Sequence, residues 1–195
     1  MSRTLFTAWR PDVAGQAALS GLRDRIVAAR PHDAPGLSLR RPDQWHVTLC
    51  FVARQTDDAM LAAVRIALGH AAAAIPAHGF TIERLAFWRH SGALVALAAP
   101  SDTLQALCDA NRDALRLAGI RPEDTTTQPH VTLAYLERGA PPQPWIEQVD
   151  CTDAPLLHVD RFELLFNAGG RYEALGEWPL TGSALPLRQS QPGLF

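Results

Sequence analysis

The chain has 195 residues, of which 47% are apolar, and its formal net charge is −2. This composition fits a folded protein with a sizeable core, and it excludes a chain that is disordered throughout or that carries the broad basic surface of a non-specific nucleic-acid binder. Arginine supplies all 18 basic residues, and the lack of lysine excludes a P-loop, a Schiff base and a lysyl-nucleotide intermediate.

The first half of the chain predicts two strands, each followed by a helix. The strands are expected over Thr4–Trp9 and Trp45–Val52, where β-prone and apolar residues cluster. One helix is expected over Val13–Ala29. A second is expected from Thr56 to Ala74, because its apolar residues recur at helical spacing.

The second half predicts mainly strands. A third helix, capped by Ser101 or Asp102, is expected to end at Gly119. Helices beside largely antiparallel strands, with no Gly-x-Gly-x-x-Gly after a strand, indicate an α+β fold. Thr181–Phe195 has no period and is expected to form a loosely held tail. The predicted strands are Phe80–Trp88, Ala93–Ala98, His130–Leu136, Val159–Phe166 and Tyr172–Leu180.

The tetrapeptide His-Val-Thr-Leu occurs twice, at His46–Leu49 and at His130–Leu133. A chain of this composition in random order would contain about 0.06 copies of His-x-Thr-Leu, so two copies are a strong motif signal. Both copies lie in predicted strands. Packing histidines are the alternative interpretation for either site alone, but the repetition favours a functional pair.

Strand geometry explains the spacing within the motif, because successive side chains point to opposite faces. His46 and Thr48 are therefore expected on one face of the first strand. Val47, Leu49 and Phe51 are expected on the opposite face, in a core. If the second motif strand lines the same cleft, two imidazoles and two hydroxyls meet there.

Such a set suits in-line displacement at phosphorus, where the entering water loses a proton and the leaving oxygen gains one. Two histidines with ordinary pKa values of about 6.5 can serve as base and acid near neutral pH. The hydroxyls of Thr48 and Thr132 can donate to the non-bridging phosphoryl oxygens. This scheme requires neither a metal nor a cofactor, and a strained cyclic phosphate is its natural substrate.

Paired His-x-Thr motifs on strands resemble the two-histidine (2H) phosphoesterase superfamily, and above all its bacterial LigT-like members, the RNA 2′,3′-cyclic phosphodiesterases or 2′-5′ RNA ligases. The resemblance is carried by Leu5–Ala8, Arg41–Leu49, Gln128–Ala134 and Tyr172–Leu180. It implies a bilobal α+β fold in which two antiparallel sheets with flanking helices have a pseudo-twofold arrangement around a central cleft. Residues 1–180 would form this single two-lobed domain.

The resemblance also implies an activity, the hydrolysis of RNA 2′,3′-cyclic phosphate ends to 2′-phosphates, together with a reversible ATP-independent 2′-5′ RNA ligase activity. By analogy His46 would be the proton donor and His130 the proton acceptor, although the near-symmetry of the motifs leaves the reverse assignment open. The expected partners are RNA ends or small cyclic nucleotides, bound by a monomer.

Residues near the motifs are candidates for further RNA contacts. Candidates for base stacking or RNA contact are Phe6, Trp9, Phe51 and Tyr135, with core packing as the alternative for the first three. Many relatives carry a basic residue just after one or both motifs, where this chain has Cys50 and Tyr135, and we expect Cys50 to share a face with His46. Candidates for the missing positive charge, with a solvated surface position as the alternative, are Arg10, Arg54, Arg89 and Arg138.

Other interpretations remain open from the sequence. The substrate could instead be a 2′-5′ oligonucleotide or an ADP-ribose cyclic phosphate, or the protein could bind RNA ends without catalysis. A metal site is disfavoured, because no carboxylate or cysteine recurs beside both motifs and the three cysteines form no CxxC. No secretory signal or apolar membrane span is recognised, so we expect a cytoplasmic protein that does not bind membranes.

Overall fold

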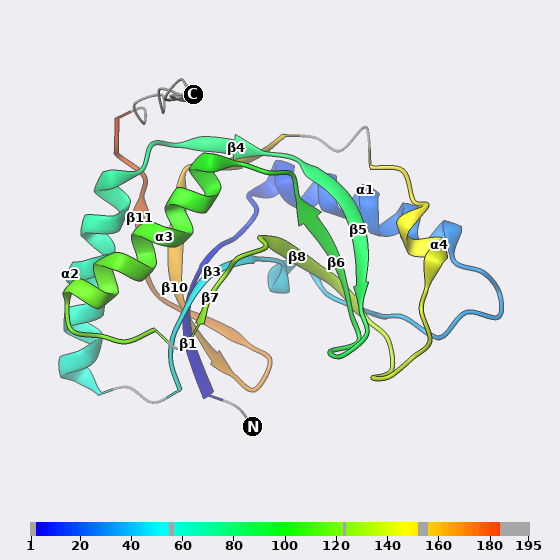
Figure 1. Cartoon of the computed structure of the whole chain (residues 1–195), viewed down its shortest axis with the longest axis horizontal. Helices are drawn as coiled ribbons and strands as arrows, with labels where there is room; N and C mark the ends of the chain where they lie inside the picture. The colour runs from blue at the N-terminus through cyan, green and yellow to red at the C-terminus, as the bar shows by residue number, and fades with distance from the viewer. Residues whose placement is uncertain (1–2, 55–56, 123, 152–155, 184–195) are drawn as a thin grey trace, which may run out of the picture.

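The computed structural model describes residues 3–54, 57–122, 124–151 and 156–183. In this part of the chain nine antiparallel strands form one sheet, and two more strands form a small second sheet (Figure 1). The strands are β1 (Arg3–Trp9), β2 (Ser38–Leu39), β3 (Val47–Ala53), β4 (His78–Phe80), β5 (Ile82–Trp88), β6 (Ala93–Ala98), β7 (Asp124–Thr125), β8 (His130–Tyr135), β9 (Leu157–Val159), β10 (Arg161–Ala168) and β11 (Tyr172–Pro179).

The main sheet has two matching halves. Its strand order is β11-β10-β1-β3-β8-β6-β5, with β2 beside β8 and β7 beside β3, while β4 pairs with β9 in the small sheet. The two motif strands, β3 and β8, meet in the middle through the pair Val47 and Val131. The α+β fold and the two-lobed arrangement are confirmed, with the halves joined into one sheet at this pair.

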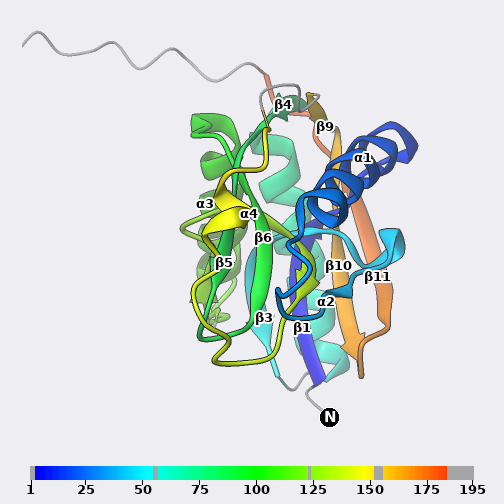
Figure 2. The ribbon, with the colours of Figure 1, turned by 90° about the vertical axis from the view of Figure 1, so that its right-hand side faces the viewer.

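Helices cover the two halves separately (Figures 1 and 2). Helices α2 (Asp58–Ala74) and α3 (Asp102–Leu117) pack together, α2 beside β11 and α3 beside β3. The short helix α4 (Pro144–Glu147) lies beside β5, and α1 (Val13–Ala29) contacts α4. Each half of the main sheet therefore has its own pair of helices.

Each long helix begins at a side-chain cap. Asp12 accepts a hydrogen bond from the backbone N–H of Gly15, and Asp57 accepts one from that of Met60. Ser101, rather than Asp102, caps α3. Capping of this kind satisfies the unpaired N–H groups of the first turn and fixes where each helix begins.

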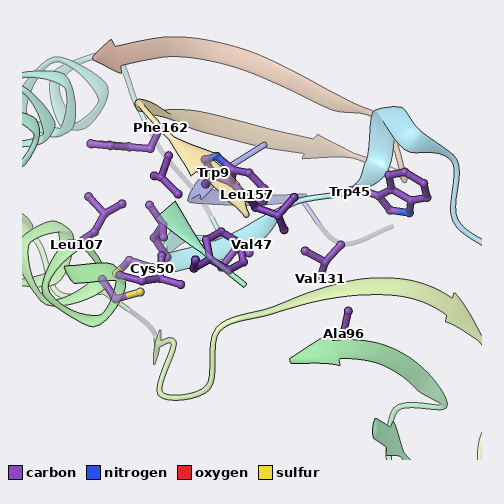
Figure 3. Packing of buried hydrophobic residues seen from close by; sticks show 14 of the residues in the cluster. Trp9, Trp45, Val47, Cys50, Ala96, Leu107, Val131, Leu157 and Phe162 are labelled. Carbon is purple, nitrogen blue, oxygen red and sulfur yellow. The ribbon is translucent and has the colours of Figure 1, made fainter. Parts of the chain in front are cut away.

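The largest apolar cluster lies between the sheet and the helices and runs through both halves. It contains the valine and leucine of both motifs, all fully buried. Figure 3 shows Trp9, Trp45, Val47, Cys50, Leu107 and Phe162 in this core. Burial of one face of both motif strands fixes the orientation of the opposite face, which carries the histidines.

A bulge interrupts the alternation of side chains in each motif strand. On β3, Ala8 pairs with Thr48 and Thr7 pairs with Cys50, which leaves Leu49 as an extra residue. On β8, the partners of Val95 and Leu94 are Thr132 and Ala134, so the motif's second leucine is again extra. An extra residue moves the side chains that follow it to the other face, until a second shift at Val52 of β3 restores the first alternation.

The expected positions of Cys50 and Phe51 are therefore wrong. Cys50 is fully buried in the main core instead of sharing a face with His46. Phe51 lies on the opposite face and packs with Phe6 in a separate small cluster. The bulge makes Phe51 the counterpart of Tyr135, and Cys50 the counterpart of Ala134.

The predicted helices and longer strands are present, and several short elements were missed. The strand predicted over Phe80–Trp88 is divided, with Phe80 in β4 and the remainder in β5. A strand as short as β2, β4, β7 or β9 contains too few residues to show a period in the sequence. A 3-10 turn over Pro42–Gln44, just before the first motif, was missed for the same reason.

The start of the predicted tail is attached to helix α2. The N–H of Thr181 donates to the carbonyl of Ala72, and the N–H of Gly182 donates to that of Ile75. These two residues of the predicted tail are thus hydrogen-bonded, and residues 184–195, to which the rest of that expectation applies, lie outside the described part of the chain. Within the described residues, no helix is long and apolar enough to cross a membrane.

Candidate active site

The two motifs approach each other at the middle of the sheet. Val47 of β3 pairs with Val131 of β8 in an antiparallel register. Because neighbouring positions of antiparallel strands run in opposite directions, His46 comes beside Thr132 and Thr48 comes beside His130. The motifs are thus related by a local pseudo-twofold axis, and their polar side chains share one face.

A pocket of about 260 Å³ lies on this face. It brings the two histidines and two threonines of the motifs together with aromatic residues and one arginine. The lining residues are Thr4, Phe6, Arg40, Gln44, His46, Thr48, Phe51, His130, Thr132, Tyr135, Asn167 and Tyr172. No carboxylate is among them, so the charged and polar groups of the pocket favour an anion.

Both imidazoles are held in the same way. Nδ1 of His46 lies 2.8 Å from the carbonyl oxygen of Gln44, and Nδ1 of His130 lies 2.9 Å from that of Gln128. A carbonyl only accepts hydrogen bonds, so each Nδ1 carries a proton and donates it. Each Nε2 is therefore the nitrogen left to exchange a proton with a ligand.

Aromatic rings surround the two histidines differently. Phe6 and Tyr172 lie against His46, with ring centroids 5.3 and 4.9 Å away. Trp88 lies against His130 at 4.3 Å, and the ring of His90 stacks on the same indole at 6.3 Å. These contacts fix the planes of both imidazoles and remove much of their water.

Burial changes how the histidines titrate. It is the main reason why the pKa of His46 falls to about 4, and the positive charges of Arg40, His130 and Arg10 lower it further. Burial also lowers the pKa of His130, although its hydrogen bond to Gln128 acts in the opposite direction. The neutral form of both imidazoles is thus favoured in the ligand-free pocket, and a bound anion would favour the protonated form.

The sequence model of the 2′-5′ RNA ligase superfamily matches residues 11–171 of the chain. This chain belongs to that superfamily. It is accordingly an enzyme of the phosphoesterase or ligase type, and it has the paired His-x-Thr motifs of the two-histidine phosphoesterases.

Solved structures of other proteins share the fold. E. coli LigT complexed with NADP+ matches with a TM-score of 0.68 and 21% identity, over 92% of this chain and 98% of LigT. The protein TT0787 of Thermus thermophilus matches with a TM-score of 0.64 and 23% identity, over 92% and 98% of the two chains. The MHV ns2 PDE domain matches with a TM-score of 0.51 and 14% identity, over 89% and 99%. None of the curated proteins matches this chain.

Two of the RNA contacts predicted for this superfamily member are wrong. Trp9 is fully buried, packs against Phe80 and donates its indole N–H to the carbonyl of His158. Side chains alternate along β1, so Trp9 lies with Leu5 on the face that packs in the core, whereas Phe6 lies on the face that lines the pocket. Arg10 forms two hydrogen bonds with the buried carboxylate of Glu163 and does not line the pocket.

The pocket of this superfamily member also contains residues that the sequence did not single out. Gln44 and Tyr172 stand in the segments that carry the resemblance, so their position was a usable signal. Arg40 directly precedes one such segment but has no motif of its own. Arg54, Arg89 and Arg138, which were expected to supply positive charge, are exposed and are not lining residues.

The described residues hold no group of three or more histidine, cysteine, aspartate or glutamate side chains arranged to bind a metal ion. The three cysteines are buried and form no disulfide. The lining residues of the pocket supply two imidazoles, hydroxyl donors and one guanidinium.

Proposed function

We propose that the enzyme hydrolyses RNA 2′,3′-cyclic phosphate ends to 2′-phosphates by metal-independent acid–base catalysis. The observation that carries the proposal is the pair of imidazoles on one pocket, each with Nδ1 bonded to a backbone carbonyl and each beside a threonine hydroxyl. Two such groups match the two proton transfers of displacement at phosphorus.

In the proposed reaction, Nε2 of His130 takes a proton from water as the water oxygen bonds to phosphorus. The bond between phosphorus and the 3′ oxygen breaks, and Nε2 of His46 gives a proton to that oxygen. The hydroxyls of Thr48 and Thr132 donate to the non-bridging oxygens as negative charge grows there. A 2′-phosphate and a 3′-hydroxyl result, and the two histidines have exchanged their protonation states.

The depressed pKa of His46 bears on its proposed role as the acid. In the ligand-free pocket it is mainly neutral near pH 7, so it needs the negative charge of the substrate to become protonated. The pseudo-twofold relation permits the opposite assignment, in which the 2′ oxygen leaves and a 3′-phosphate forms. The position of the phosphate in the product reports which oxygen leaves, and it identifies the acid once the orientation of the bound substrate is known.

The nucleotide part of the proposed substrate is supported by the relatives. Crystal structures of E. coli LigT include complexes with 3′-AMP, with ATP and with phosphate. In this chain Phe51 and Tyr135 line the pocket and are not fully buried, so they can offer ring faces to a base, whereas Phe6 is buried against His46. A terminal nucleotide with a cyclic phosphate combines these two kinds of contact.

Turnover of 2′,3′-cyclic AMP and of a cyclic-ended oligonucleotide by the purified protein in EDTA tests the function. We expect a 2′-phosphate product, and a loss of kcat of about 10²–10⁴-fold in both His46→Ala and His130→Ala. His70→Ala is the matched control, because His70 lies exposed on α2 outside the pocket.

Unchanged turnover in either motif variant would contradict the catalytic assignment, and a protein that binds the oligonucleotide without turnover would be a binding module. Activity that disappears with EDTA would contradict the metal-independent reaction. Turnover confined to a 2′-5′ oligonucleotide or to ADP-ribose cyclic phosphate, assayed alongside, would keep the chemistry and replace the substrate.

A further inference from the structure

We propose that Arg40 binds a non-bridging oxygen of the phosphate in this pocket and supplies the positive charge that neither motif strand provides. The proposal rests on the proposed function, since it assigns a ligand to the same site. It adds a binding residue that belongs to neither motif and that directly follows β2, the short strand paired with β8.

The backbone places Arg40 between the two motifs. Its N–H donates to the carbonyl of Leu133, inside the second motif, at 2.8 Å. The two preceding residues pair with β8 as well, Leu39 with Ala134 and Ser38 with Tyr135. A residue only six positions before His46 is thereby anchored to the strand that carries His130.

Two tyrosines hold the side chain of Arg40 in the pocket. One guanidinium N–H donates to the hydroxyl of Tyr172 at 3.1 Å, and the guanidinium carbon lies 5.7 Å from the ring centre of Tyr135. Tyr172 in turn meets His46 edge-on. A guanidinium has five N–H groups, so binding to one hydroxyl leaves donors for a phosphate.

No acidic side chain neutralises Arg40 among the described residues that line the pocket. Its neighbour Arg41 is different, because it is exposed and forms an ion pair with Asp43. Arg10, which directly follows β1, is paired with Glu163. Arg40 is the one arginine among the lining residues that the structure describes, and its charge also lowers the pKa of nearby Asp43.

The charge of Arg40 also acts on the first histidine. It is one of the charges that lower the pKa of His46. The positive charge of Arg40 repels a protonated His46 in the empty pocket, and by the same Coulomb interaction it attracts a bound anion. A bound phosphate would offset this repulsion and would let His46 become protonated.

A purely structural role is the competing explanation, in which Arg40 only ties the end of β2 to Tyr172 at the start of β11. Phosphate affinity and the titration of His46 separate the two roles. If Arg40 is only a structural tie, its loss lowers the stability of the protein, but a variant that still folds keeps the same phosphate affinity and the same pKa of His46. Arg40→Lys keeps the charge and loses the fork of donors, whereas Arg40→Gln loses the charge.

The experiment measures the Kd of inorganic phosphate by calorimetry and the titration of His46 by NMR, in the full chain and in Arg40→Gln, Arg40→Lys and Arg41→Gln. Hydrogen bonds to charged groups predict that Arg40→Gln raises the Kd about 10–100-fold. The pKa of His46 should rise in the same variant. Arg40→Lys should retain part of the affinity, and Arg41→Gln should match the unmodified protein.

An unchanged phosphate Kd in folded Arg40→Gln would overturn the proposal, and so would an equal loss in Arg41→Gln. If Arg40→Gln does not fold, Arg40→Lys carries the test, since it removes the fork of donors and should weaken phosphate binding; unchanged binding there overturns the proposal too. Phosphate binding needs no turnover, so a protein that binds phosphate through Arg40 but leaves cyclic phosphates intact would refute only the proposed function.

Discussion

The two catalytic candidates have the same backbone anchor but different surroundings. Phe6 and Tyr172 enclose His46, whereas Trp88 covers one side of His130. Since burial disfavours a charged imidazole, the more enclosed His46 has the lower pKa. Equal motifs in the sequence therefore become unequal acids in the structure.

This inequality predicts the pH dependence of kcat/KM, which reports the free enzyme. One histidine must be protonated and the other neutral, so activity requires a pH near or between their pKa values. These are about 4 for His46 and below 6.5 for His130. We expect a bell-shaped profile with its maximum below pH 6.5, measured with 2′,3′-cyclic AMP.

Arg40→Gln should shift the acidic limb of this profile to higher pH, because the substitution removes a positive charge that lowers the pKa of His46. Arg41→Gln, at the exposed neighbouring arginine, should leave the profile in place. A maximum above pH 7 in the unmodified protein would contradict the unequal titration of the two imidazoles.

At the scale of elements, the bulges decide which side chains reach the pocket. Without an extra residue in β3, strict alternation would point Cys50 to the pocket and Phe51 to the core. The register of β3 against β1 reverses this, and the register of β8 against β6 repeats it at Tyr135. Each half thus presents a histidine, a threonine and an aromatic ring.

Substitutions at these two positions test the bulge. Cys50→Ser should destabilise the protein by about 1–3 kcal/mol, because it places a hydroxyl in an apolar core, and should leave the KM for a cyclic nucleotide unchanged. Phe51→Leu should raise this KM, because a pocket ring is lost. Urea unfolding and steady-state kinetics on both variants measure the two effects, and the opposite pattern would show that the strand alternates without a bulge.

Helix α2 and the motif strands were predictable because an apolar period marks the helix and a repeated motif marks the strands. Helix α1 begins at the cap formed by Asp12, and it has the predicted bounds Val13–Ala29. The two threonines and two histidines of the pocket followed from a repeated motif. The bulges were not predictable, because His-Val-Thr-Leu looks the same with or without an extra residue.

Contacts between distant segments account for the other errors. Trp9 and Arg10 were predicted to contact RNA, but each is bonded to a distant segment instead. Trp9 donates to the carbonyl of His158 in β9, and Arg10 binds the carboxylate of Glu163 in β10. Arg40 was overlooked because its place depends on the pairing of β2 with β8, a contact between segments far apart in the sequence. Closeness to a motif in the sequence therefore does not predict which arginine side chain lines the pocket.

For the whole molecule, the buried histidine links folding to pH. The pKa of His46 is depressed in the folded protein and returns to about 6.5 on unfolding. Between these values the unfolded chain binds more protons, so the free energy of unfolding should fall as the pH is lowered from about 6.5 to about 4.

Chemical denaturation across this range measures the effect. His46→Gln, which removes the titrating group, should flatten the dependence relative to the unmodified protein, and His70→Ala at the exposed position on α2 should leave it unchanged. An equally steep fall in His46→Gln would assign the acid sensitivity to other groups.

The join between the halves at Val47 and Val131 places the local axis of symmetry near the proposed phosphorus position. The entering and departing oxygens would then meet matching groups, and a strand's 5′-hydroxyl could take the place of water as the entering oxygen. Mass action would set the outcome, because water at its bulk concentration outcompetes a dilute strand terminus. A lower water concentration or a higher concentration of the strand terminus should therefore increase the share of phosphodiester formed by the same two imidazoles.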